Sequence, residues 1–153
     1  MMKPISVWKQ ELSGGAHAAR LAALYCCAPE QTPAQAARYE AVLDGLEATF
    51  GPHAEAGLYS APGRTEIGGN HTDHQHGRVL AGSVNIDMIA AAGPNTLGQL
   101  RVQSEGYDLC VIDLNDLAAR KEEENTSAAI LRGECEAFRQ RGAKLSGLDV
   151  YIS

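Results

Sequence analysis

Apolar residues in the first third of the chain recur every three or four positions, which is the spacing of amphipathic helices. The pattern predicts three helices, over residues 5–12, 16–27 and 34–50. Thr32 is the expected N-cap of the third helix, because its hydroxyl can accept a hydrogen bond from a free N–H and Pro33 suits the first turn. Gly51 and Pro52 then end that helix.

From Tyr59 onward the apolar runs become short and are separated by glycine and polar residues, a pattern typical of strands. Extended segments are predicted over residues 59–69, 79–92, 100–104, 109–114 and 148–153. The third and fourth form a hairpin, because the residues between them suit a loop. Residues 116–125 are charged and suit a surface loop or a short helix.

A fourth helix is predicted near the end of the chain, over residues 126–141. Its expected buried side carries Ile130, Leu131, Cys135 and Phe138. The order of helices, strands, a helix and a strand indicates an α+β domain with a sheet covered on one face. The chain ends inside an apolar strand pattern, which natural domains seldom do, so we expect residues 1–153 to be a single partial domain.

Composition narrows the class of protein further. The chain of 153 residues suits one domain, and its net charge of −6 argues against a nucleic-acid partner, which requires clustered basic residues. No apolar run reaches the roughly 18 residues of a membrane span, and the N-terminus lacks the apolar stretch of a signal peptide. A cytoplasmic protein with reduced cysteines is therefore expected.

Residues 61–77 bring glycines, histidines, acids and an arginine into one short span. A carboxylate such as Asp73 only accepts hydrogen bonds, whereas the neutral imidazole of His71 and the amide of Asn70 can each donate and accept them. This mixture suits the neighbouring hydroxyls of a sugar. Arg64 adds a permanent positive charge, which can hold a carboxylate or stabilise charge on a transferring phosphoryl group.

The same residues allow two other interpretations. One is a polar loop without a ligand. The other is a metal site built from His71, Asp73, His74 and His76. Their spacing places side chains on both sides of an extended segment, and His17 and His53 are isolated, so no metal is expected.

The sequence of residues 61–77, APGRTEIGGNHTDHQHG, resembles the galactokinase signature APGRVNLIGEHTDYNxG without a gap. The apolar strand that follows it, the helix over 126–141 and the strand over 148–153 also fit that family. The resemblance implies the N-terminal domain of the galactokinase, homoserine kinase and mevalonate kinase superfamily, a fold like domain 2 of ribosomal protein S5. It implies transfer of the ATP γ-phosphoryl group to the anomeric hydroxyl of galactose, with ATP and Mg²⁺ as cofactors of the intact enzyme.

The resemblance also implies roles for individual residues. Arg64 matches a catalytic and sugar-binding arginine near the catalytic aspartate, and Asn70, His71 and Asp73 match positions that bind the sugar. Asn70 replaces the glutamate of the family, so a negative charge is lost and the identity of the sugar is open. No stretch of the chain matches the phosphate-binding patterns GxxxxGK[ST] or GxGxxG.

We therefore expect N-terminal helices over 1–58 and a galactose-binding motif with mixed sheet and helix over 59–153, ending before the ATP-phosphate loop. Such a chain is expected to be inactive by itself and to hold no cofactor. Its expected partners are galactose or a related sugar and a second copy of the chain, which would pair through the uncovered sheet. A non-catalytic sugar sensor and a metal-dependent hydrolase remain the alternatives.

Overall fold

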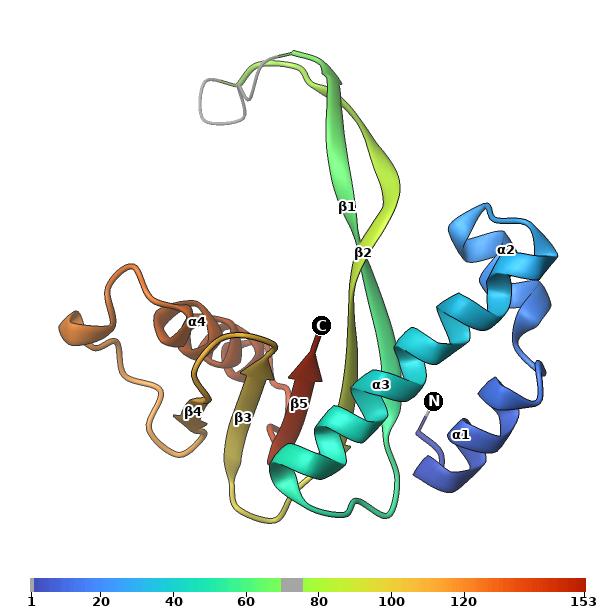
Figure 1. The fold of residues 1–153 in the computed structure, drawn as a ribbon. Helices are drawn as coiled ribbons and strands as arrows, with labels where there is room; N and C mark the ends of the chain where they lie inside the picture. The colour runs from blue at the N-terminus through green and yellow to red at the C-terminus, as the bar shows by residue number, and fades with distance from the viewer. Residues whose placement is uncertain (1, 70–75) are drawn as a thin grey trace.

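The computed structural model describes residues 2–69 and 76–153, which form helices packed on a mixed sheet (Figure 1). The α-helices are α1 (Ile5–Ser13), α2 (Ala18–Tyr25), α3 (Thr32–Phe50) and α4 (Ser127–Gln140), with short 3₁₀ turns η1 (Pro29–Gln31) and η3 (Lys121–Glu123). The strands are β1 (Gly57–Gly68), β2 (Leu80–Pro94), β3 (Gln99–Ser104), β4 (Cys110–Asp113) and β5 (Leu148–Ile152). Their order is β1-β2-β5-β3-β4, and β3 and β5 are the parallel neighbours.

These elements confirm the helices and strands expected from the sequence, with small shifts at their ends, but the expected cap of α3 is wrong. The 3₁₀ turn η1 runs directly into α3, so Gln31 takes the cap position and Thr32 becomes the first helical residue. The Thr32 hydroxyl donates to the carbonyl of Pro29 at 2.8 Å. It therefore ties the helix to the turn before it.

The main core lies between α3 and the β1–β2 pair. Val42, Leu43 and Leu46 of α3 are fully buried, and they pack with Ile89 and Ala91 of β2. Apolar residues of α1 and α2 belong to the same cluster. Full burial of each large side chain stabilises the fold by about 1.5–3 kcal/mol, so this cluster holds the N-terminal helices on the sheet.

Helix α4 packs on the opposite face of the sheet from α3. Neighbouring strand residues face opposite sides. On β3, Arg101 stacks on Phe50 of α3 at 4.8 Å, whereas Leu100 packs against the cluster that contains Ile112 of β4 and Cys135 of α4. The expectation of a sheet covered on one face is wrong, because the helices divide between its two faces.

The buried side of α4 also differs from the expected one. Leu131 and Cys135 pack inward, but Ile130 and Phe138 are 69% and 54% exposed. An arginine takes the place of an apolar residue: Arg132 is buried, donates to Glu123 at 2.6 and 2.7 Å, and also reaches a backbone carbonyl. An ion pair thus fixes the rotation of this helix, which an apolar stripe does not reveal.

The β1 and β2 strands extend beyond the rest of the sheet as a two-stranded arm (Figure 1). Strand β5 pairs with β2 over Ala90–Pro94, so residues 80–88 of β2 pair with β1 alone among the described strands. Ile67, Ile86 and Met88 of the arm are 67%, 76% and 58% exposed. The arm therefore presents apolar side chains to solvent.

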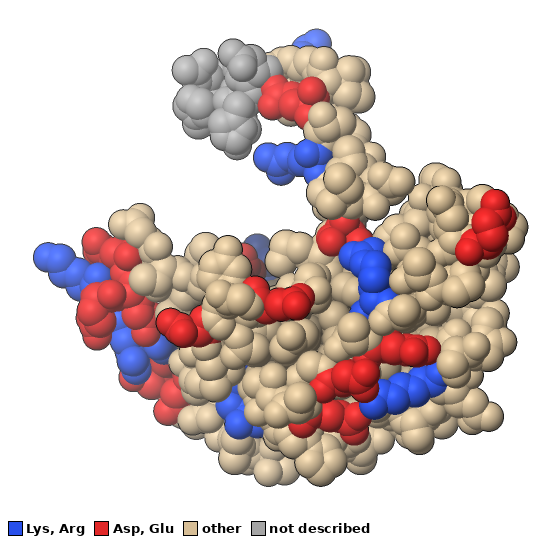
Figure 2. Space-filling model, in the orientation of Figure 1, with Lys and Arg blue, Asp and Glu red and all other residues tan. Residues whose placement is uncertain are grey.

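Acidic and basic side chains lie close together on the helical body, as Figure 2 shows. Lys9 of α1 contacts Asp44 at 2.7 Å and Glu47 at 2.8 Å, which links α1 to α3. In this view, no broad patch of positive or negative charge covers the described residues. Within residues 2–69 and 76–153, no helix combines the length and the apolar character that crossing a membrane requires.

Candidate functional site

Of the residues expected to form the site, the structure describes Arg64. Arg64 is an exposed residue of β1 and pairs with Ser83 of β2. Asn70, His71 and Asp73 lie outside the described residues. The structure therefore places one member of the expected set, on the outer half of the two-stranded arm.

A break in strand register precedes Arg64. Between the pairs Pro62–Asp87 and Arg64–Ser83, β1 advances by two residues while β2 advances by four. Gly63 sits at this irregularity, where an added Cβ would lie 3.1 Å from both the carbonyl oxygen of Ile86 and the Val84 side chain. Such a bulge bends and twists the two paired strands, so it sets the direction in which the Arg64 side chain points away from β1.

The glycine just before the undescribed segment has a clear steric reason. Gly69 has φ +110°, and a Cβ there would lie 2.4 Å from the Arg78 carbonyl oxygen and 2.6 Å from the Val79 Cα. Only glycine adopts this conformation readily at such a close approach. The signature glycine at position 69 thus lets the two strands of the arm close on each other.

A buried carboxylate that accepts three side-chain hydrogen bonds lies at the base of the arm. The Asp87 side chain is 2% exposed. It accepts hydrogen bonds from Ser60 at 2.5 Å, Tyr25 at 2.6 Å and Arg38 at 2.8 Å, and the Tyr39 hydroxyl lies 2.8 Å from that of Tyr25. These bonds join α2 and α3 to both strands of the arm.

The network at the base of the arm holds Asp87 ionised. Burial by itself raises the pKa of Asp87, but the three hydrogen bonds that it accepts outweigh this, and its pKa lies below the ordinary 3.8. Burial and the neighbouring Asp87 raise the pKa of Tyr25 far above its usual value. Tyr25 is therefore a hydrogen-bond donor throughout the neutral range.

A second buried carboxylate lies in the middle of the sheet. Asp149 of β5 is 1% exposed and receives two bonds of 2.6 Å from Arg101 and one of 2.6 Å from Asn95. The ring of His53 lies 3.0 Å away, and an added Cβ at Gly93 would overlap that ring. This cluster connects β3 and β5 with the segments that follow β2 and α3, far along the sheet from Arg64, so we assign it a structural role.

Sequence reasoning missed both carboxylate networks. Asp87 and Asp149 each interrupt an otherwise apolar strand, and a charge at such a position requires buried partners. That signal was present in the sequence. The partners were not visible, because Arg38 and His53 lie 49 and 96 residues from the carboxylates that they contact.

Residues 2–69 and 76–153 bear on the alternative of a metal site. They contain no group of three or more histidine, cysteine or acidic side chains that could hold a metal ion. The sequence also lacks both common phosphate-loop patterns. The alternative metal residues His71, Asp73 and His74 lie outside the described part of the chain.

Comparison with known proteins places the site in a family context. Residues 46–94 match the family model of the galactokinase galactose-binding signature, which covers the end of α3 and the whole arm. The galactokinase of Streptomyces coelicolor is 32% identical over 99 residues, covering 63% of this chain and 25% of that protein. The galactokinase of Ligilactobacillus salivarius is 30% identical over 115 residues, covering 72% of this chain and 29% of that protein.

Solved structures share the fold. The crystal structure of Lactococcus lactis galactokinase complexed with galactose matches with a TM-score of 0.64 at 20% identity, covering 78% of this chain and 30% of that one. Methanococcus jannaschii mevalonate kinase matches with a TM-score of 0.51 at 10% identity, covering 67% of this chain and 33% of that one. The chain thus spans about a third or less of each relative.

The chain has the mixed α+β fold seen in Lactococcus lactis galactokinase and Methanococcus jannaschii mevalonate kinase. Residues 46–94 match the galactose-binding signature of galactokinases, and the chain is similar in sequence to several galactokinases. The resemblance seen in residues 61–77 is thereby confirmed.

Proposed function

We propose that this chain is the sugar-binding part of a galactokinase-type enzyme, which transfers the γ-phosphoryl group of ATP to the anomeric hydroxyl of galactose. The observation that carries the proposal is the match of residues 46–94 to the galactose-binding signature, which coincides with the arm. A relative with the same fold is described as a complex with galactose, which supports a sugar as the ligand.

Each signature residue has a chemical task in this proposal. Asp73 accepts hydrogen bonds from sugar hydroxyls, and His71 and Asn70 donate and accept. Arg64 adds a positive charge that stabilises the transferring phosphoryl group and orients the sugar. Asn70 contributes no charge where the family has a glutamate, so it holds a hydroxyl by a neutral hydrogen bond that is weaker than a charge-assisted one.

Sugar binding and phosphoryl transfer are separable in this proposal. MgATP is the proposed phosphoryl donor, and phosphoryl transfer depends on a phosphate cradle and metal ligands, to which we assign no residue of this chain. We propose that the chain by itself binds galactose with a Kd weaker than about 100 µM, which corresponds to roughly 5.5 kcal/mol, and does not phosphorylate it.

The experiment is a galactose titration followed by NMR of the isotope-labelled chain. Galactose is expected to shift backbone amide signals of residues 60–90 saturably, whereas glucose, which differs in one hydroxyl orientation, shifts them less. Asp73→Asn should remove the galactose response. Asp108→Asn, which changes an exposed acid outside the arm, is the matched control and should respond like the parent. Absence of a saturable response to galactose, or an unchanged response in D73N, would overturn the proposal.

A non-catalytic sugar sensor is the second candidate, and the replacement of the family glutamate by Asn70 favours it. Both candidates bind galactose, so the discriminating measurement is product formation. The product of the complete gene should form galactose 1-phosphate from galactose and ATP if it is an enzyme. Saturable galactose binding without that product would establish the sensor.

A further inference from the structure

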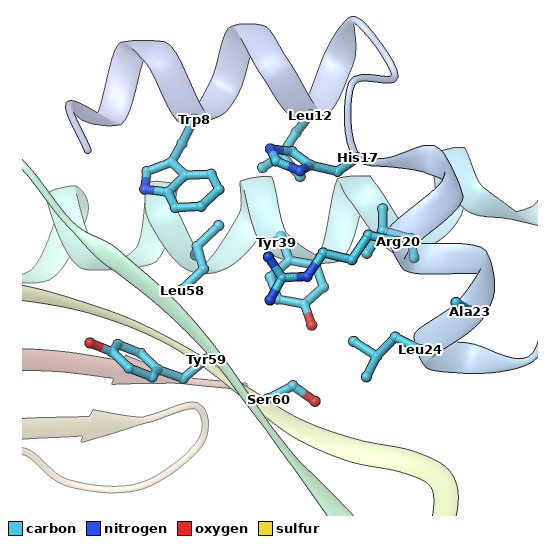
Figure 3. Close-up of a pocket in the computed structure, with 11 residues that line it drawn as sticks. Trp8, Leu12, His17, Arg20, Ala23, Leu24, Tyr39, Leu58, Tyr59 and Ser60 are labelled. Carbon is cyan, nitrogen blue, oxygen red and sulfur yellow. The ribbon is translucent and has the colours of Figure 1, made fainter. Parts of the chain in front are cut away.

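A cavity separate from Arg64 and the end of the arm lies between α1, α2, α3 and the first residues of β1 (Figure 3). Its volume of about 530 Å³ falls within the range of about 300–1,000 Å³ typical of small-molecule sites. Most of its wall is apolar, from Trp8, Leu12, Leu21, Leu24 and Leu58. Leu58, Tyr59 and Ser60 of its wall fall within the matched residues 46–94, but the proposed function assigns no role to them.

The inner wall of the cavity offers hydrogen-bond acceptors of fixed orientation. The Ser60 hydroxyl and the Tyr25 hydroxyl both donate to Asp87. Because the Tyr25 proton is used there, its oxygen accepts from the Tyr39 hydroxyl 2.8 Å away. Ser60 and Tyr39 both line the cavity, and with their protons committed they can only accept. A ligand N–H or O–H group can therefore donate a hydrogen bond to the oxygens of Ser60 and Tyr39.

The opposite rim of the cavity carries positive charge. The exposed Arg20 side chain extends from α2 toward the middle of the cavity, as Figure 3 shows. It takes part in none of the ion pairs between described residues. His17 also lines the rim and lies 2.8 Å from Glu11, whose charge is shared with Lys3 at 2.6 Å. Glu11 is therefore already paired with Lys3, and Arg20 is available for an anion.

We propose that this cavity binds a small aromatic carboxylate that also carries a hydrogen-bond donor. The ring packs among the apolar wall residues, the carboxylate pairs with Arg20, and the donor meets the oxygens of Ser60 and Tyr39. An arginine fork matches a carboxylate in geometry and charge. The site would couple such a ligand to the base of the arm, because Asp87 fixes the two acceptors.

The test uses two matched probes and NMR titration of the 153-residue chain. Indole-3-propionate has a ring, an N–H donor and a carboxylate, and indole-3-propionamide is its neutral counterpart. The anion is expected to bind the parent more tightly than the amide and to shift signals of α1, α2 and the start of β1. Arg20→Gln should weaken binding of the anion by about tenfold, as loss of a charge-assisted hydrogen bond implies. Binding of the amide should stay unchanged.

Two further variants complete the design. Arg141→Gln changes another exposed arginine, at the end of α4, and should bind both probes like the parent. Ala23→Phe adds a ring at an exposed cavity position and should weaken the binding of both probes, because the ring fills part of the cavity. The proposal is wrong if R20Q and R141Q bind the anion equally. It is equally wrong if the shifted signals lie on the arm at Ile86 and Met88, which would indicate nonspecific binding to exposed apolar surface. Because neither outcome depends on galactose, the proposal stands or falls separately from sugar binding.

Discussion

Single residues with buried charge hold distant parts of the chain together, and Asp149 is the clearest case. Replacing it with Asn keeps the shape but leaves Arg101 without a counter-ion in a partly buried position. Breaking such a pair typically costs about 3–5 kcal/mol, and we expect Asp149→Asn to lower the free energy of unfolding by about 3 kcal/mol. Urea unfolding measures this. The exposed control Asp108→Asn should change it by less than about 0.5 kcal/mol.

The stability contributed by Asp149 should also depend on pH. Burial acts to raise its pKa, but the bonds from Arg101, Asn95 and His53 lower it below the ordinary 3.8. A lowered folded-state pKa means that the contribution is complete above the ordinary value and is lost as pH falls through the folded-state value. The difference in unfolding free energy between the parent and D149N should therefore be constant near neutral pH and shrink in acid. A difference that grows as pH falls would contradict this sign.

Two adjacent glycines at the end of β1 allow a second residue-scale prediction. A Cβ at Gly69 would overlap the backbone of residues 78 and 79, and φ is +110°, whereas a Cβ at Gly68 meets nothing within 4 Å. Gly69→Ala is expected to destabilise the arm by about 1–3 kcal/mol and to abolish the galactose response, while Gly68→Ala leaves both unchanged. Hydrogen exchange of arm amides and the galactose titration report the two effects.

At the scale of elements, the close approach of α3 to β5 requires a residue without a side chain, Gly45, on α3. A Cβ at Gly45 would lie 2.4 Å from the Tyr151 ring, whereas one at Gly133 of α4 meets nothing within 4 Å. Gly45→Ala should therefore cost about 1–3 kcal/mol by overpacking. The same change at Gly133 should stabilise by about 0.5–1 kcal/mol, because Ala has the higher helix propensity. Thermal unfolding of the two variants should move in opposite directions.

At the scale of the whole molecule, the arm presents exposed apolar side chains on an open strand. Ile86 and Met88 lie on a stretch of β2 that pairs on one side among the described strands, and such edges associate readily. We expect the chain to self-associate at high concentration. Ile86→Lys should return it to a monomer in sedimentation, and Ile130→Lys, at a similarly exposed position on α4, should not. A parent that stays monomeric at high concentration would contradict this expectation.

Much of the fold was predictable because its signals are local. Periodicity identified α1, α2, α3, α4 and the five described strands, since each pattern depends on residues a few positions apart. The galactose-binding signature was also predictable, because its residues are contiguous in sequence. The buried side of α4 could not be predicted, because it includes Arg132, which is buried through an ion pair with Glu123. A propensity or hydropathy pattern assigns such an arginine to the surface.

The class of fold and the position of the sugar signature thus follow from the order of residues alone. The partners of Asp87 and Asp149, the bend before Arg64 and the cavity beside Arg20 follow only from tertiary structure. The physical reason is distance along the chain: Tyr25 meets Asp87 across 62 residues and His53 meets Asp149 across 96. Which distant groups meet is decided when the helices pack on the sheet, and no local pattern of residues records it.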